Sequence, residues 1–271
     1  MKDKPSNNIA QITAWIFILA ISLFGIILQE IFHFPVTESL QFTIRAGMLA
    51  LGLAMAFLWK PLHPLRAFFG LLAVLTAAQW LVFTRIDQLP IYQTWLANPS
   101  FNVYMLAEQS LNLMVTLIVI AFLLLLRKKP REFFLARGNP AAPAEAVKWL
   151  DIPAGQPWSV LGRNFAFFIS LGTLAFLMLA GRPPVDFALR ALPFLPAVLL
   201  AAALNAFNEE MTYKASFLSV LEQAVGKKQA LLLMAAFFGI FHYYGIPYGV
   251  VGVALATFLG WFLGKSMLET R

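Results

Sequence analysis

Cysteine is absent from this 271-residue chain, so a disulfide framework, a thiol nucleophile and a thiolate metal site are all excluded. Charge is also scarce: Asp, Glu, Lys and Arg make up 12% of the residues, against about 25% in ordinary soluble domains. Histidine occurs only three times, at His33, His63 and His242. Any chemistry must therefore depend on a small number of polar side chains.

Hydrophobic residues, in contrast, make up 60% of the chain, and the mean hydropathy is +0.75. Irregular backbone cannot face lipid, so apolar segments of this length are expected to be membrane helices. We therefore predict an all-α, polytopic membrane helical bundle of about eight transmembrane helices. The expected spans are Ile9–Phe32, Phe42–Trp59, Pro64–Phe83, Val103–Leu126, Asn164–Ala180, Val185–Ala206, Ala230–Ile246 and Tyr248–Gly264.

The positive charges test this topology. With the N-terminus in the cytoplasm and alternating spans, all but four of the 20 Lys and Arg residues, Lys2 and Lys4 included, fall on the cytoplasmic side. The exceptions are Arg45, Arg85, Arg182 and Arg190. This bias is what the positive-inside rule requires. The net charge of +7 therefore indicates membrane orientation and contact with anionic membrane lipids, and we expect no nucleic-acid partner.

The chain divides into three expected parts. Residues 1–127 form an N-terminal four-span membrane region without concentrated chemistry. Residues 128–163 form a polar cytoplasmic loop with Pro and Gly punctuation and a short helix expected around Ala144–Leu150. Residues 164–271 form a second membrane region, which holds every candidate site residue.

Two adjacent acids are the most informative feature of the second region. Glu209 and Glu210 follow the apolar run Val185–Ala206, and largely apolar sequence continues after them. Carboxylates at membrane depth are costly and are therefore functional candidates. Glu210 and Lys214 are one helical turn apart and can form an ion pair. A solvated pair at the cytoplasmic end of the helix is the alternative interpretation.

His242 is the second element, in the sequence Phe238-Gly-Ile-Phe-His242 of the next apolar segment. A carboxylate and an imidazole on consecutive spans can polarise one water molecule, as base and orienting group. Because aromatic residues flank His242, membership of an interfacial aromatic belt is the alternative. The last span carries small residues every four positions, at Gly252, Ala256, Gly260 and Gly264, which predicts close helix packing and no chemistry.

Together, Glu209-Glu210-x-x-x-Lys214 and Phe238-x-x-x-His242 resemble the motifs of the CAAX prenyl protease and bacteriocin-processing family. These are the Rce1-like, Abi or CPBP intramembrane glutamate proteases, whose motifs are Glu-Glu-x-x-x-Arg and Phe-x-x-x-His. The resemblance covers about residues 160–271 and is strong over 205–264. It implies that Glu209 is the catalytic base, that Glu210 and His242 complete the catalytic set, and that Lys214 and Phe238 support it. It implies no metal and no other cofactor, and a cavity open to the cytoplasm.

The sequence departs from the family pattern in two ways. Lys214 stands where the motif has Arg, which keeps the charge but loses the planar bidentate fork. A further family motif, with His and Asn or Asp on a later helix, does not occur before Arg271. We expect a truncated form, with a differently completed site or an inactive member as alternatives.

The predicted function is therefore an intramembrane CAAX/Abi-type peptidase of the bacterial cytoplasmic membrane. It would hydrolyse a peptide bond near the cytoplasmic face, in a peptide or a lipidated peptide. A non-catalytic membrane scaffold or immunity protein of the same family is the main alternative. A transporter that binds cations at Glu209 and Glu210 is less expected, because no inverted repeat is visible. The sequence leaves the substrate and the oligomeric state open.

Overall fold

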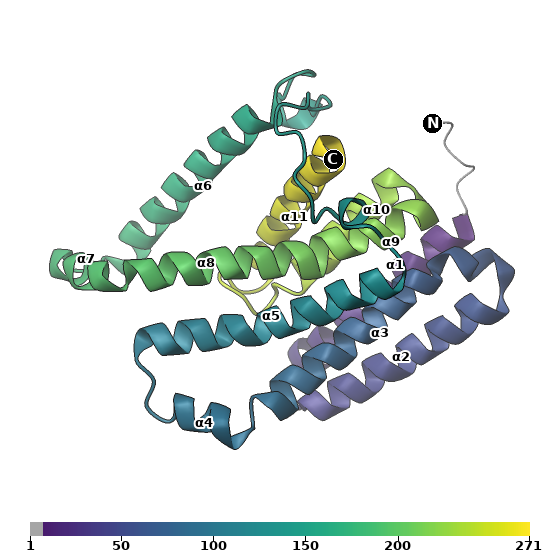
Figure 1. The fold of residues 1–271 in the computed structure, drawn as a ribbon, viewed down its shortest axis with the longest axis horizontal. Helices are drawn as coiled ribbons and strands as arrows, with labels where there is room; N and C mark the ends of the chain where they lie inside the picture. Colours follow the sequence, from purple (N-terminus) through teal and green to yellow (C-terminus); the bar gives the residue numbers. More distant parts are fainter. Residues whose placement is uncertain (1–7) are drawn as a thin grey trace.

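A computed structural model describes residues 8–271, and these residues form helices joined by turns and one long loop, without a β-sheet. The predicted all-α polytopic bundle is thus confirmed. The helices, drawn in Figure 1, are α1 (Asn8–Ile26), α2 (Glu38–Leu58), α3 (Arg66–Leu81), α4 (Pro90–Leu96), α5 (Phe101–Leu125), α6 (Trp158–Gly181), α7 (Val185–Ala191), α8 (Leu195–Glu209), α9 (Ser216–Val225), α10 (Lys227–Ile240) and α11 (Val250–Thr270).

Between residues 8 and 271, seven helices are long and apolar enough to cross a membrane, so the chain is an integral membrane protein. The segment expected as a further span, Ala230–Ile246, differs: α10 ends at Ile240, after 14 residues. At about 1.5 Å per residue α10 is about 21 Å long, short of the roughly 30 Å membrane core. A non-helical turn follows it, and Gly249 takes a positive φ just before α11. Lys2 and Lys4, used above for the topology, lie outside the described residues.

The two acids lie on a helix much longer than predicted. The span that contains α8 continues through a π-helical turn, Glu210–Ala215, into α9, and runs from Leu189 to Val225 over 37 residues. Nothing between Glu209 and Val225 breaks a helix, and it ends only at Gly226, whose φ is +86°. The acids therefore lie near the middle of this long helix, and the expectation that the span ends at Ala206 is wrong.

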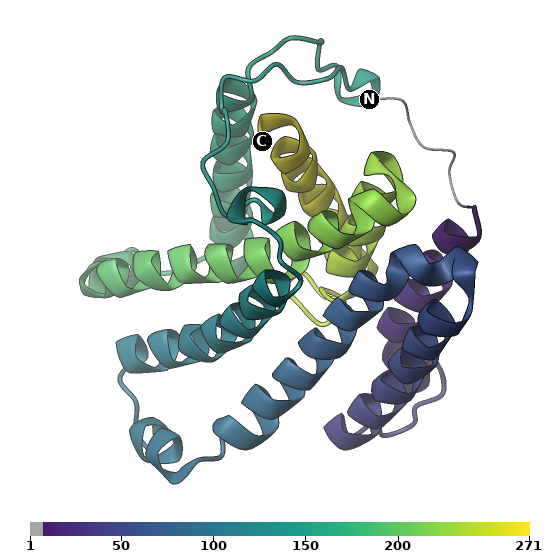
Figure 2. The same ribbon diagram turned by 45° about the vertical axis from the view of Figure 1, so that its right-hand side comes forward.

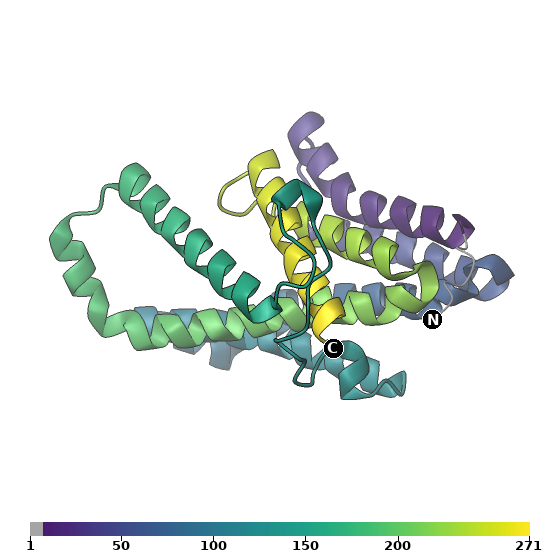
Figure 3. The same ribbon diagram turned by 90° about the horizontal axis from the view of Figure 1, so that it is seen from above.

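Both halves of the chain share one buried core. The ring of Phe68 on α3 lies 6.3 Å from that of Phe217 on α9, which lies 4.5 Å from Phe237 on α10. Figure 1 shows α5 and α3 running beside the long helix, and α11 crossing α10. Figure 3 shows α7 at the edge of the bundle, where it joins α6 to α8, and α6 exposes apolar side chains such as Phe167 and Leu179, as a lipid-facing helix does.

The loop between α5 and α6 contains no α-helix at Ala144–Leu150, where a short helix was expected. Only a 3-10 turn at Lys148–Leu150 forms there, beside isolated β-bridges. The loop runs next to the C-terminal end of α11 (Figure 2). Glu269 of α11 connects the two: its Oε2 accepts hydrogen bonds from the Trp158 indole at 3.0 Å and from the Glu145 backbone N–H at 3.1 Å. Its Oε1 pairs with Lys265.

Glu269→Ala should destabilise the protein far more than Glu145→Ala, although both acids contact Lys265. The Glu269 side chain is 5% exposed and that of Glu145 is 69% exposed. Leaving buried Lys265 without Glu269 should cost about 3 kcal/mol or more of unfolding free energy. The exposed Glu145 pair should contribute about 1 kcal/mol or less. Thermal unfolding in detergent, with limited proteolysis of the loop, measures both; equal effects of the two substitutions would contradict this account.

Candidate active site

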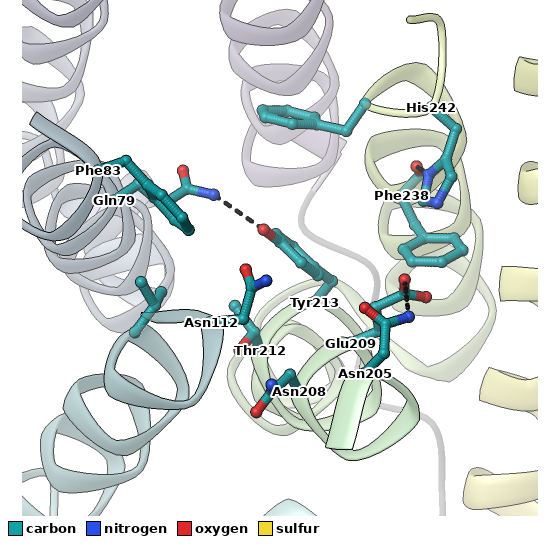
Figure 4. A pocket seen from close by; sticks show the side chains of 12 residues that line it. Gln79, Phe83, Asn112, Asn205, Asn208, Glu209, Thr212, Tyr213, Phe238 and His242 are labelled. Atoms are coloured by element: carbon teal, nitrogen blue, oxygen red, sulfur yellow. Dashed lines mark hydrogen bonds between the residues drawn. The ribbon is translucent and has the colours of Figure 1, made fainter. Parts of the chain in front are cut away.

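A cavity of about 220 Å³ lies beside the middle of the long helix (Figure 4). It brings together Glu209 and His242, which the sequence analysis proposed as partners. Phe238 of α10 lines the same cavity. Since one water takes about 30 Å³, the cavity has room for several waters or for part of a peptide. Its wall consists of Gln79, Phe83, Asn112, Val115, Asn205, Asn208, Glu209, Thr212, Tyr213, Phe238, Phe241 and His242.

Glu209 is the carboxylate of this cavity. Asn205, one turn earlier on α8, donates an Nδ2 hydrogen bond to Oε1 of Glu209 at 2.8 Å. Within residues 8–271 no cation forms an ion pair with this carboxylate. The Asn205 amide therefore orients the group without neutralising it, and the other carboxylate oxygen can accept a proton from a water molecule in the cavity.

Glu210, in contrast, does not line the cavity. Its Oε1 pairs with Nζ of Lys214 at 2.8 Å, which confirms the predicted i,i+4 pair. The Lys214 side chain is only 1% exposed, and its ammonium lies 3.7 Å from the centroid of the Phe238 ring in a cation–π contact. Glu210 thus neutralises a buried lysine that in turn holds a wall of the cavity in place.

His242 follows the end of α10, and its Nδ1 lies 2.7 Å from the carbonyl oxygen of Phe238. A carbonyl oxygen only accepts, so Nδ1 carries a proton; in the neutral imidazole Nε2 is then an acceptor. The imidazole also packs on the Phe238 ring, with 4.4 Å between centroids. Figure 4 shows this ring between the imidazole and the Glu209 carboxylate.

The small residues of α11 allow this arrangement. A Cβ added to Gly260 would lie 2.9 Å from a ring carbon of Phe238, and one added to Gly239 would lie 1.8 Å from Oγ1 of Thr257 on α11. The backbones of α10 and α11 therefore approach as closely as the spacing of Gly252, Ala256, Gly260 and Gly264 predicted. This contact sets the position of Phe238 and, through it, of His242.

Several polar residues of the cavity were not singled out in the sequence. The hydroxyl of Tyr213, one turn after Glu209, accepts a hydrogen bond from Nε2 of Gln79 on α3 at 2.8 Å. Asn112 of α5 also reaches the wall. Both Gln79 and Asn112 belong to the N-terminal four-span region. A side-chain amide inside an apolar run marks a candidate functional residue in the same way as a carboxylate does. A search of the sequence for such amides would have identified Gln79 and Asn112.

Asn208 holds α5 against α8. It is 4% exposed, its Oδ1 accepts from the Thr116 hydroxyl at 3.0 Å, and its Nδ2 donates to the Gln109 carbonyl at 3.2 Å. The hydroxyls of Thr116 and Thr212 lie 2.9 Å apart. These bonds satisfy the polar groups around the π-helical turn. Such turns are frequent at functional sites. Within the described part of the chain, no group of three or more His, Asp or Glu side chains is placed to hold a metal ion.

A double-mutant cycle tests the buried pair. Lys214→Met should lower the unfolding free energy by about 3–5 kcal/mol, because Glu210 keeps its charge and loses its partner. Adding Glu210→Gln should restore most of this loss, since both charges are then absent. Thermal unfolding of the single and double variants in detergent measures the coupling. A double variant no more stable than Lys214→Met would contradict a direct pair.

Comparison with protein families supports the same region. The model of the family described as type II CAAX prenyl endopeptidase Rce1-like matches residues 191–271. No curated protein and no solved structure shows a significant match to the chain. The matched segment contains Glu209, Glu210, Lys214, Phe238 and His242, the residues on which the resemblance was based. Residues 191–271 of this membrane protein are thus similar to the Rce1-like type II CAAX prenyl endopeptidases.

Proposed function

We propose that the chain is an intramembrane peptidase in which Glu209 activates a water molecule for attack on a peptide carbonyl. The observation that carries the proposal is the shared cavity: a carboxylate without an ion pair among the described residues and an imidazole with a free acceptor line the same space. The family match supports a peptide as substrate. Membrane lipids are the expected surroundings.

The reaction uses groups that the cavity provides. Glu209 takes a proton from the water while the resulting hydroxide attacks the carbonyl carbon. His242 lines the same cavity on the far side of the Phe238 ring, where its Nε2 can accept a hydrogen bond from a donor of the bound peptide or from a second water. The carbonyl oxygen becomes an oxyanion. When the C–N bond breaks, Glu209 returns its proton to the leaving amine, and the products are a carboxylic acid and an amine.

Tyr213 is suited to stabilise the oxyanion. Since its oxygen accepts from Gln79, its own proton remains available to donate into the cavity. A donor aimed at developing charge in a water-poor site stabilises the transition state more than the bound substrate. Tyr213 lies one turn from Glu209, so one helix supplies both the base and the donor.

Glu210 has a supporting role in this scheme, outside the cavity, because it neutralises Lys214 and so helps to hold Phe238. The same pairing disfavours a cation site shared by Glu209 and Glu210, since Lys214 already occupies Glu210. With the N-terminus in the cytoplasm, Val225 lies at the cytoplasmic end of the long helix, about 24 Å along its axis from Glu209.

Glu209→Gln should abolish cleavage without loss of folded protein. The amide keeps the shape and can still contact Asn205, but the base is gone, so the rate should fall on the order of a hundredfold or more. Protein in lipid nanodiscs is incubated with a library of short randomised peptides, and products are read by mass spectrometry. Glu222→Gln, on the same long helix but paired with Arg271 outside the cavity, is the matched control and should stay active. Full activity of Glu209→Gln would rule the peptidase out.

Tyr213→Phe should lower kcat by about 100- to 1,000-fold with little change in KM, because the hydroxyl acts on the oxyanion and not on the bound peptide. The peptide cleaved best in the library serves as substrate. Gln79→Leu should lower kcat less, in the same direction. Tyr104→Phe, which changes an exposed tyrosine of α5, is the control. A raised KM with unchanged kcat would instead place the hydroxyl in ground-state binding.

A further inference from the structure

Arg45, on α2, is a charged residue that the proposed reaction does not use. Its Nε is closed off from solvent and has no hydrogen-bond partner. Among residues 8–271, no carboxylate lies within ion-pair distance of its guanidinium. A lone cation inside a membrane helix is costly and marks a functional position by default, with an anion as the expected partner.

Two aromatic rings hold this guanidinium. Its central carbon lies 5.7 Å from the centroid of Phe24 on α1 and 5.2 Å from that of Phe241. Such contacts stabilise and orient a cation but provide no lone pair for its N–H donors. The guanidinium is therefore positioned in advance and keeps its donors for a planar anion, and a carboxylate matches this donor geometry.

Phe241 connects Arg45 to the candidate active site. The ring that contacts Arg45 also lines the cavity, and it directly precedes His242. Arg45 itself does not line the cavity, so an anion on its guanidinium would lie behind the Phe241 ring, next to the space that Glu209 and His242 share.

Arg85 is an exposed arginine with which Arg45 can be compared. Arg85 lies at the end of the α3 segment, is exposed, and lies over the single ring of Trp80 at 5.1 Å. An exposed arginine of this kind reaches water or lipid headgroups with its charged end. Arg45 instead contacts two rings, of which Phe241 belongs to the cavity wall, and its Nε is shielded, which favours an occupant on the cavity side of α2 over a lipid headgroup.

We propose that Arg45 binds a carboxylate of the substrate peptide and so positions the peptide along the cavity. The inference rests on the proposed peptidase function and names a substrate class, peptides with a carboxylate beyond the scissile bond. That carboxylate comes either from the C-terminus or from an Asp or Glu side chain. Both sources offer the same planar, two-oxygen anion to the guanidinium.

The test measures binding without cleavage. The Glu209→Gln protein, in nanodiscs of phosphatidylcholine, is mixed with short randomised peptides made in two forms, C-terminal acid and C-terminal amide. Bound peptides are recovered and identified by mass spectrometry. Acid forms should be recovered about tenfold or more over amides, as expected of a charge-assisted bond. Enrichment of Asp- and Glu-containing peptides in the amide library would identify the side chain as the source and supports the site equally.

Variants of Arg45 complete the test. Adding Arg45→Gln should remove the preference for carboxylates, Arg45→Lys should keep part of it, and Arg85→Gln should keep all of it. Thermal unfolding of each variant shows whether it is folded, and the lysine variant retains the charge. Equal recovery of acids and amides without enrichment of Asp- and Glu-containing peptides, or a preference that survives Arg45→Gln, would overturn the proposal.

Three further outcomes separate the alternatives. If phosphatidylglycerol stabilises the parent protein but not Arg45→Gln, and peptide recovery is unchanged, the site binds lipid and the proposal is wrong. If peptides bind through Arg45 but wild-type protein cleaves none, the carboxylate site stands and the proposed peptidase does not. Cleavage without a preference for carboxylates contradicts the site alone.

Discussion

A lysine that neither water nor lipid reaches sets the conditions for the rest of the site. Lys214 is 1% exposed, so its charge requires a partner inside the bundle. Glu210 provides the anion, and the ring of Phe238 covers the ammonium from the other side. Phe238 is also the surface on which His242 packs, and its carbonyl determines which ring nitrogen of His242 carries the proton. One buried charge thus fixes a wall of the cavity and the orientation of its imidazole.

Two adjacent carboxylates acquire different roles from their surroundings. Glu210 is neutralised by Lys214 outside the cavity, whereas Glu209 accepts a hydrogen bond from the neutral amide of Asn205 and pairs with no cation among the described residues. Successive residues on a helix point about 100° apart, so neighbours in sequence face different elements. The π-helical turn that follows Glu209 and the bonds around Asn208 hold this helix against α5. The polar groups are therefore fixed in place before any substrate enters.

Much of the fold followed from composition and hydropathy alone. The membrane helices, the pairing of Glu210 with Lys214 and the close approach of α10 and α11 were all predicted, because they depend on length, on i,i+4 spacing and on small side chains. The end of the span at Ala206 was predicted wrongly, since charge was taken as a boundary although no helix breaker follows before Gly226. The N-terminal part of the cavity was missed because Gln79 and Asn112 lie far from Glu209 in sequence and are uncharged.

The sequence by itself determined that this chain lies in a membrane, that its candidate site residues lie between Glu209 and His242, and which motif they form. These properties follow from hydropathy and local spacing, which depend on near neighbours. Only the tertiary structure decided that Glu209 and not Glu210 faces the cavity, that α3 and α5 complete its wall, and that Arg45 contacts Phe241 with no carboxylate of the described residues in ion-pair range. Such facts depend on how helices distant in sequence pack, and packing is set by the shape and partners of every side chain in the shared core.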